Sequence, residues 1–83
     1  MLPHVIAARH IVGHRVWLHF DDGLEGELEL ADELYGPVFQ PLLAVERFAE
    51  LRVEGGTLAW PNGADLAPEY LHERVRASLP PRT

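Results

Sequence analysis

The chain has 83 residues, of which 47% are hydrophobic, a composition that excludes a disordered chain and fits one domain over residues 1–83. Cysteine is absent, so disulfide bonds and thiolate metal sites are excluded. The formal net charge is −6, and the 7 residues counted as basic are all arginines, which argues against a broad phosphate-binding surface and direct nucleic-acid binding. This acidic balance permits a basic protein partner, but keeping the protein soluble is an equally sufficient reason for it.

The sequence shows neither a membrane span nor a targeting segment. No apolar run approaches the ~18 residues that indicate a transmembrane helix, and the N-terminus has no signal-peptide pattern. We therefore expect a soluble cytoplasmic protein without a membrane association, with frayed ends at residues 1–3 and 80–83.

The N-terminal part of the chain predicts three antiparallel strands. Residues 5–9 favour a first strand, and residues 10–13 favour a turn. Residues 14–20 and 24–30 then alternate between apolar and polar side chains, as half-buried strands do. The Asp-Asp-Gly sequence of residues 21–23 is typical of the hairpin turn between them.

The length of this turn follows from the strand register. A two-residue loop at Asp22 and Gly23 would place apolar residues opposite charged ones along the whole hairpin. A three-residue loop with a left-handed Gly23 instead pairs Phe20 with Leu24 and keeps one face wholly apolar, so we expect the longer loop. On the other face this register pairs His19 with Glu25, Trp17 with Glu27, and Arg15 with Glu29.

The predicted register leaves Trp17 on the charged face, beside Glu25 and Glu27. The tryptophan is then either shielded by neighbouring loops or part of an interface, and both interpretations stay open. These three residues are candidates for an interaction site. The Arg15–Glu29 pair on the same face contributes at most ~1 kcal/mol if it is exposed.

The middle of the chain predicts short helical segments. Residues 31–35 favour a helical turn that the Gly-Pro pair at residues 36–37 ends, and residues 38–45 favour a second short helix. Phe48 is expected to anchor the turn that follows. Three apolar residues of the second segment are spaced to face a core: Phe39, Leu42 and Leu43.

The C-terminal part predicts a second hairpin and a last helix. Residues 51–54 and 57–60 form the hairpin across a Gly-Gly turn, and residues 68–79 form the helix, which the following Pro-Pro pair stops. Leu71, Val75 and Leu79 recur at four-residue spacing and are expected to lie on the sheet. The element order βββ-α-ββ-α predicts an α+β domain with an antiparallel sheet and helices packed on one face.

A corner with two prolines connects this second hairpin to the last helix. Pro61 ends the strand, Asn62 begins an Asn-Gly turn, and Asp65 is placed to accept from free N–H groups at the helix start. Trp60 is expected to pack where the corner closes over the core. Turn and cap roles account for both polar residues, but Asn62 and Asp65 also have a functional interpretation as a small polar site beside Trp60.

The side chains that carry chemistry do not form a recognisable catalytic pattern. The sequence has five histidines, and their spacing is not that of metal ligands. For example, His10 and His14 flank a turn, His19 lies next to Glu25, and His72 is expected on the outer helix face. No serine lies in a nucleophile-elbow motif, and the acidic residues of residues 25–29 are typical of a solvated strand face. We therefore expect no enzyme activity, no cofactor and no metal.

Three blocks resemble one family. They are Val-Trp-Leu-His-Phe-Asp-Asp-Gly at residues 16–23, Gly-Pro-Val-Phe-Gln-Pro-Leu at residues 36–42, and Leu-Ala-Trp-Pro-Asn-Gly-Ala-Asp-Leu-Ala-Pro-Glu-Tyr-Leu at residues 58–71. Together they make the chain similar to the domain-of-unknown-function 2442 family over residues 5–71, and the Trp-Pro-Asn-Gly-x-Asp block is the specific part. The resemblance implies a small bacterial α+β domain without agreed catalytic residues.

The same resemblance bears on partners. Some relatives carry a helix-turn-helix domain after this one, and this chain is expected to end too soon for it. Short members of the family look like partners of small neighbouring proteins, in arrangements similar to toxin–antitoxin pairs.

The sequence therefore leaves three hypotheses about function. The first is a non-enzymatic protein–protein interaction module, with an antitoxin-like role as one form, which masks a basic partner through the Trp17 and glutamate face or a free sheet edge. The second is a small ligand-binding domain or enzyme with a pocket near Trp60, Asn62 and Asp65. The third is a homodimer that pairs by sheet edges or faces.

Overall fold

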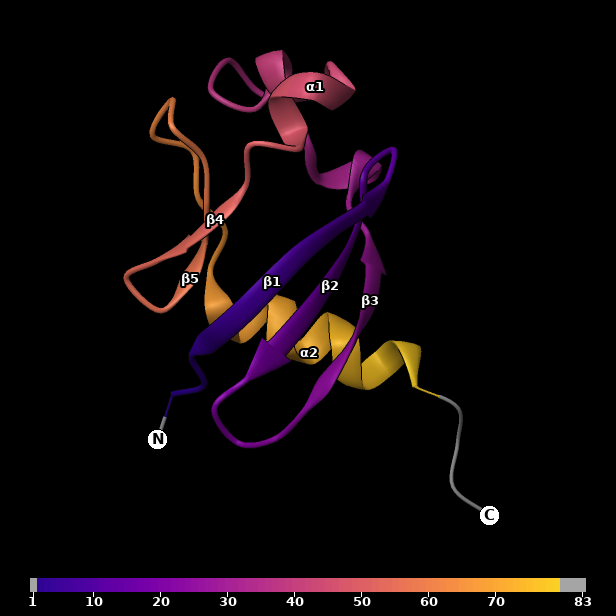
Figure 1. The fold of residues 1–83 in the computed structure, drawn as a ribbon, viewed down its shortest axis with the longest axis vertical. Helices are drawn as coiled ribbons and strands as arrows, with labels where there is room; N and C mark the ends of the chain where they lie inside the picture. The colour runs from indigo at the N-terminus through magenta and orange to yellow at the C-terminus, as the bar shows by residue number, and fades with distance from the viewer. Residues whose placement is uncertain (1, 80–83) are drawn as a thin grey trace.

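The computed structural model describes residues 2–79, which form an α+β domain with two antiparallel sheets (Figure 1). The larger sheet has the strand order β1-β2-β3, with bounds Val5–Val12, Arg15–Phe20 and Glu25–Glu29. The smaller one is a hairpin of β4 and β5, Arg52–Glu54 and Thr57–Ala59. The helical segments are η1, η2, α1 and α2, with bounds Ala31–Glu33, Gln40–Leu43, Val45–Phe48 and Pro68–Ser78.

Figure 1 shows how these elements are layered. Helix α2 crosses one face of the three-stranded sheet, the short helical segments gather at one end of it, and the β4–β5 hairpin lies beside β1. The N–H of Val5 donates to the carbonyl of Gly56 at 2.8 Å, which joins the two sheets. The predicted α+β class and element order are confirmed, and the five strands are divided between two sheets.

The register of the β2–β3 hairpin is the predicted one. Arg15 pairs with Glu29, Trp17 with Glu27, and His19 with Glu25. The N–H of Phe20 donates to the carbonyl of Leu24 at 2.8 Å across a three-residue loop. Gly23 has φ 93°, a left-handed conformation that residues with a Cβ rarely adopt, and this allows the loop to close.

Strand β1 is longer than predicted, because residues 10–12 continue the strand instead of forming a turn. Register shifts between Val5 and Ala7 and between His10 and Val12 let the strand bend while it stays paired with β2. The turn is confined to residues 13–14, and the pair of Val12 and Arg15 flanks it.

The main core lies between the three-stranded sheet and α2. Val16, Leu18 and Phe20 of β2 are fully buried, and Leu71 and Val75 of α2 are buried with them. These are the positions that period-two alternation and four-residue helical spacing predict. Leu79, by contrast, is 43% exposed, because α2 ends at Ser78 and the next side chain lies only near Gly26 on the outer strand of the sheet.

The predicted helix over residues 38–45 is divided. Ala44 has an extended conformation, φ −73° and ψ 121°, and separates η2 from α1. As a result Leu42 is buried and Phe39 is partly buried, whereas Leu43 is 50% exposed, contrary to the prediction. Phe48 is fully buried and anchors this end of the domain as expected.

Among the helices of residues 2–79, none has both the length and the apolar composition that crossing a bilayer requires. The predicted frayed ends fall partly on residues 1 and 80–83, which lie outside the described residues. Of the rest of that prediction, Leu2 is exposed and Pro3 is partly buried.

Candidate functional site

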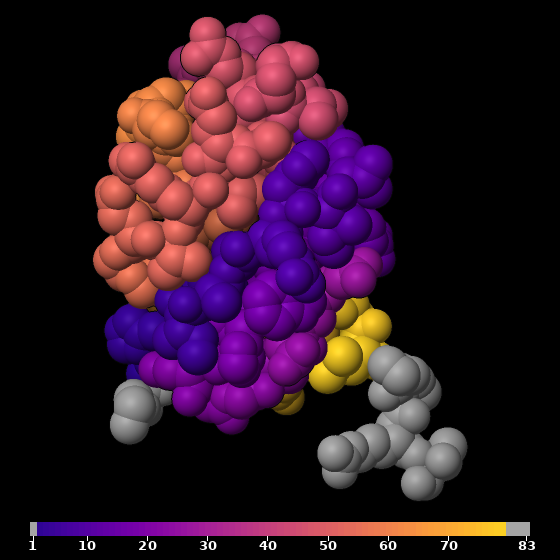
Figure 2. Space-filling model, viewed as in Figure 1, coloured from indigo at the N-terminus to yellow at the C-terminus, as the bar shows by residue number. Residues whose placement is uncertain are grey.

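The first candidate site is the outer face of the three-stranded sheet, opposite α2. We call it the acidic face. It is formed by side chains that alternate with the core positions: Arg9, Arg15, Trp17, His19, Glu25, Glu27 and Glu29. Figure 1 shows α2 behind the sheet and no described element in front of it, and Figure 2 shows the surface on this side. The face is therefore open to a partner.

Trp17 lies near the middle of this face, on the central strand. The Cζ atom of Arg9, its pairing partner on β1, is 5.2 Å from the centroid of the Trp17 ring. The centroid of the His19 ring lies 5.8 Å from that of the Trp17 ring, and the two rings are tilted by 45°. A guanidinium over an aromatic ring is a favourable cation–π arrangement. Trp17 is therefore partly shielded by side chains of the sheet itself, not by loops, and the rest of it faces solvent.

The charges of the acidic face are not paired as the sequence suggests. Arg15 donates from Nε to Oε1 of Glu27 at 2.9 Å, not to Glu29, which is directly opposite. Strand twist brings diagonal neighbours within reach of a long side chain, and this explains the exchange. Glu29 accepts a hydrogen bond from the N–H of Ala31, and within residues 2–79 neither Glu25 nor Glu29 has a cationic partner.

The second candidate site is the corner after β5. Trp60 is only 1% exposed, and its Nε1 donates to the carbonyl of Phe48 at 2.9 Å, so it closes the core as predicted. Asn62 makes two hydrogen bonds: Nδ2 donates to the carbonyl of Val38 at 2.9 Å, and Oδ1 accepts from the N–H of Ala64 at 3.1 Å. The side chain of Asn62 therefore fixes the turn and ties it to the segment before η2.

Asp65 does not cap the last helix, contrary to the prediction. The N-cap residue is Ala67, without a side-chain cap, and Pro68 begins the helix. Asp65 instead forms an isolated antiparallel bridge with Ala59, and its side chain is exposed. The extended backbone that this bridge requires keeps Asp65 outside the first helical turn. Asn62 and Asp65 therefore have separate structural roles at this corner, and within residues 2–79 no side-chain hydrogen bond joins them.

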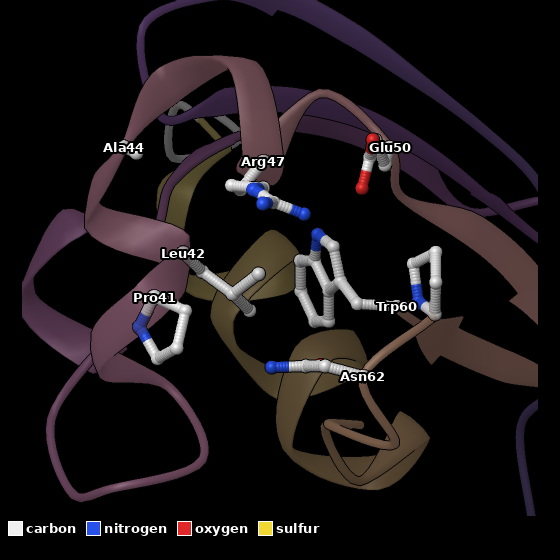
Figure 3. Close-up of a pocket in the computed structure, with 8 residues that line it drawn as sticks. Pro41, Leu42, Ala44, Arg47, Glu50, Trp60 and Asn62 are labelled. Atoms are coloured by element: carbon white, nitrogen blue, oxygen red, sulfur yellow. The ribbon is translucent and has the colours of Figure 1, made fainter.

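A hollow of about 620 Å³ opens between this corner and the η2–α1 segment, as Figure 3 shows. Its lining is mostly apolar, with Pro41, Leu42 and Trp60 inside and Arg47 and Glu50 as its charged residues. Asn62 also lines it, but Asp65 does not. Because the Trp60 ring is covered by the protein itself, it offers little surface for a ligand to stack on.

Two histidines near the β1–β2 turn pack on the core. The rings of His10 and His14 meet Phe48 edge to face, at 5.9 and 4.9 Å between centroids. His10 donates from Nε2 to the carbonyl of Gly13 at 2.8 Å, and His14 donates from Nε2 to that of Leu42 at 3.0 Å. Both rings are therefore structural, a role that the sequence pattern did not indicate.

His72 is not on the outer face of α2, as the sequence suggested, but faces the β2–β3 turn. Its Nε2 lies 2.7 Å from Oδ2 of Asp22, its ring meets Phe20 edge to face, and its side chain is only 17% exposed. The N–H of Leu24 and the His72 ring both hydrogen-bond the Asp22 carboxylate and lower its pKa. Within residues 2–79, no three histidines, aspartates or glutamates are grouped to hold a metal ion.

Comparison with protein families matches residues 5–77 to the family described as Protein of unknown function (DUF2442). The chain belongs to this family. The resemblance over residues 5–71 is thereby confirmed, and the match continues along α2 to residue 77. Comparisons with curated proteins and with solved structures return no match. A family of unknown function assigns no catalytic or ligand-binding residue to this chain.

Proposed function

We propose that this DUF2442 domain is a non-enzymatic protein–protein interaction module that binds a basic protein through its acidic face. The observation that carries the proposal is Trp17, which is partly exposed on the central strand of a sheet face that no described element covers. Tryptophan is enriched where protein surfaces associate, because it has a large rigid ring that loses little entropy when it is buried.

The charges around Trp17 indicate the kind of partner. Glu25 and Glu29 have no cationic partner within residues 2–79, and the whole chain has a net charge of −6. Arginine or lysine side chains of a partner would complement this face and accelerate the encounter. A cytoplasmic bacterial protein that masks a small basic toxin, in the manner of an antitoxin, is the specific form of this proposal.

The test is capture of a partner by matched variants of the tagged chain. Wild type should retain a stoichiometric basic protein from lysate of the native host, and Trp17→Ala should retain at least about tenfold less, as expected for an interface hot spot. Trp17 is outside the core, so Trp17→Ala should remain folded, which circular dichroism checks.

Charge is tested separately. Glu25→Gln with Glu29→Gln should weaken binding of the purified partner, whereas Glu54→Gln with Glu73→Gln removes the same charge from other elements and should change it little. Equal binding by wild type, Trp17→Ala and both double variants, measured by calorimetry, would refute the proposal.

The hollow beside Trp60 supports a second candidate, a small-ligand site. Its size of about 620 Å³ is within the range of ligand pockets, and its apolar lining with Arg47 as its cation suits a small aromatic carboxylate. A thermal-shift screen of such compounds tests this, because a ligand that binds only the folded state raises its melting temperature. Compounds that stabilise Arg47→Ala as much as wild type would contradict this site.

A further inference from the structure

The hydrogen bonds of the β2–β3 hairpin determine which main-chain groups of β3 remain free. Leu24 accepts from Phe20, and Leu30 donates to His14, so both residues are in hydrogen-bonded pairs with β2. In an antiparallel ladder such pairs alternate with pairs that make no ladder bonds. Gly26 and Leu28 therefore also bond β2, while the N–H and C=O groups of the three glutamates point away from the sheet: Glu25, Glu27 and Glu29.

This outer edge of β3 is unpaired within residues 2–79. The larger sheet ends at β3, and Figure 1 shows no further described strand beside it, while α2 passes behind it. No main-chain hydrogen bond from another described segment reaches the three glutamates. A free edge of this kind is a template for an added strand.

Charge decides which strand can be added. If a second copy of the chain paired its own β3 here in antiparallel register about Glu27, glutamate would lie opposite glutamate at all three positions. Like charges directly opposite are destabilising, whereas opposite charges stabilise the pairing. The edge therefore disfavours a β3-to-β3 dimer and favours a strand with a basic residue at every second position.

The other face of an added strand would meet α2. Leu79 is 43% exposed, and one of its methyl groups would lie 3.9 Å from a Cβ added at Gly26. The residue opposite Gly26 in an added strand would lie next to this exposed leucine. An apolar residue suits that position, since it would cover Leu79 and remove apolar surface from water.

We propose that the β3 edge binds an extended segment of alternating basic and apolar residues by strand addition. This inference rests on the proposed function, because it names the part of the basic partner that the domain recognises. Main-chain hydrogen bonds from Glu25, Glu27 and Glu29 would hold the segment. The carboxylates of Glu25 and Glu29, which have no cationic partner within residues 2–79, would select its basic residues, and Leu79 would contact its apolar ones.

The test uses a fluorescent seven-residue peptide of alternating arginine and valine, with an alternating glutamate and valine peptide as the control. Fluorescence anisotropy should show binding of the arginine peptide alone. Hydrogen exchange should show that the peptide protects the amides of Glu25, Glu27 and Glu29, which a peptide bound only to the acidic face would leave unprotected. Failure of the arginine peptide to bind, or binding without this protection, would overturn strand addition.

Two substitutions at one position separate the main chain from the charge. Glu27→Pro removes an N–H that points away from β2, so it should leave the hairpin intact and weaken binding of the peptide by at least about tenfold. Glu27→Thr keeps this N–H but removes the carboxylate and its hydrogen bond with Arg15, and it should weaken peptide binding about two- to fivefold. Equal binding by both variants would overturn the inference; if Glu27→Pro fails to fold, Glu25→Pro at the first residue of the strand replaces it.

These results are independent of the Trp17 experiment. If a partner no longer binds Trp17→Ala but binds Glu27→Pro as well as wild type, the acidic face is the binding site and the β3 edge is not. If the peptide binds the β3 edge but binding of every partner is independent of Trp17, the acidic face is not the binding site.

Discussion

Replacing Gly26 by alanine should destabilise the domain, although alanine is normally the better residue within a strand. A Cβ added at Gly26 would lie 2.9 Å from Cγ1 of Val75, which is fully buried in α2. Valine has one strongly preferred rotamer in a helix, so Val75 cannot easily rotate away. Overpacking costs about 1–3 kcal/mol, and removing a strand glycine returns about 0.5–1 kcal/mol, so we expect a net loss of about 1–2 kcal/mol.

Thermal unfolding followed by circular dichroism measures this loss. A destabilisation of 1–2 kcal/mol in a domain of this size should lower the melting temperature by about 4–16 °C. Val75→Ala in the Gly26→Ala background should remove the overlap. The double variant should therefore be more stable than the sum of the two single changes predicts, by about 1 kcal/mol.

Two results would refute this reasoning. An unchanged or higher melting temperature of Gly26→Ala would show that α2 is not held against the sheet at this distance. Additive effects of Gly26→Ala and Val75→Ala would show that the two residues do not meet.

Two further predictions concern polar side chains. Asn62→Ala should lower the free energy of unfolding by about 1–2 kcal/mol because it loses two hydrogen bonds to the main chain, whereas Asp65→Ala should change it by less than about 0.5 kcal/mol. Urea unfolding of the two variants at equal protein concentration compares these effects. Equal effects would contradict the different roles of the two side chains. The pKa of Asp22 is lowered from its ordinary value of 3.8 by Leu24 and His72, so its contribution to stability is present above that value and is lost as the pH falls through the lowered pKa. Asp22→Asn should therefore be less stable than wild type at neutral pH, and this difference in stability should disappear at low pH. Unfolding measured over an acid titration tests this, and a difference in stability that stays constant with pH would be inconsistent with the linkage.

The β2–β3 hairpin was predictable from sequence because two independent constraints agree there. Alternation separates the core residues Val16 and Leu18 from Trp17, and only a three-residue loop keeps that separation on both strands. The left-handed Gly23 satisfies the same loop. Local pattern and global packing thus require one register, and the structure has it.

The parts that could not be predicted depend on contacts between distant segments. His72 lies on a helix whose pattern alone places it outward, but Asp22 lies 50 residues earlier in the chain and binds its ring. Asp65 has the sequence spacing of a helix cap, but its pairing with Ala59 overrides that preference. The direction of Arg15 depends on strand twist, which sequence alternation does not encode.

The candidate site divides in the same way. Alternation was enough to place Trp17, Glu25 and Glu27 on one face, because period two requires nothing beyond the strand itself. The hollow beside Trp60 was expected near the corner, but Arg47 and Glu50 reach it from α1 and the residues after it, and no local pattern joins these segments.

The contact between His72 and the β2–β3 turn also orders the steps of folding. The hairpin joins residues that are neighbours in sequence, so its loop closes rapidly and at little entropic cost. Helix α2 reaches the same turn across 50 residues, and contacts of such separation form slowly. Until α2 arrives, the apolar side of the hairpin is exposed to water. During synthesis, which proceeds from the N-terminus, the hairpin leaves the ribosome before α2 does, so the nascent chain passes through a stage in which the apolar side of the hairpin is accessible to other molecules.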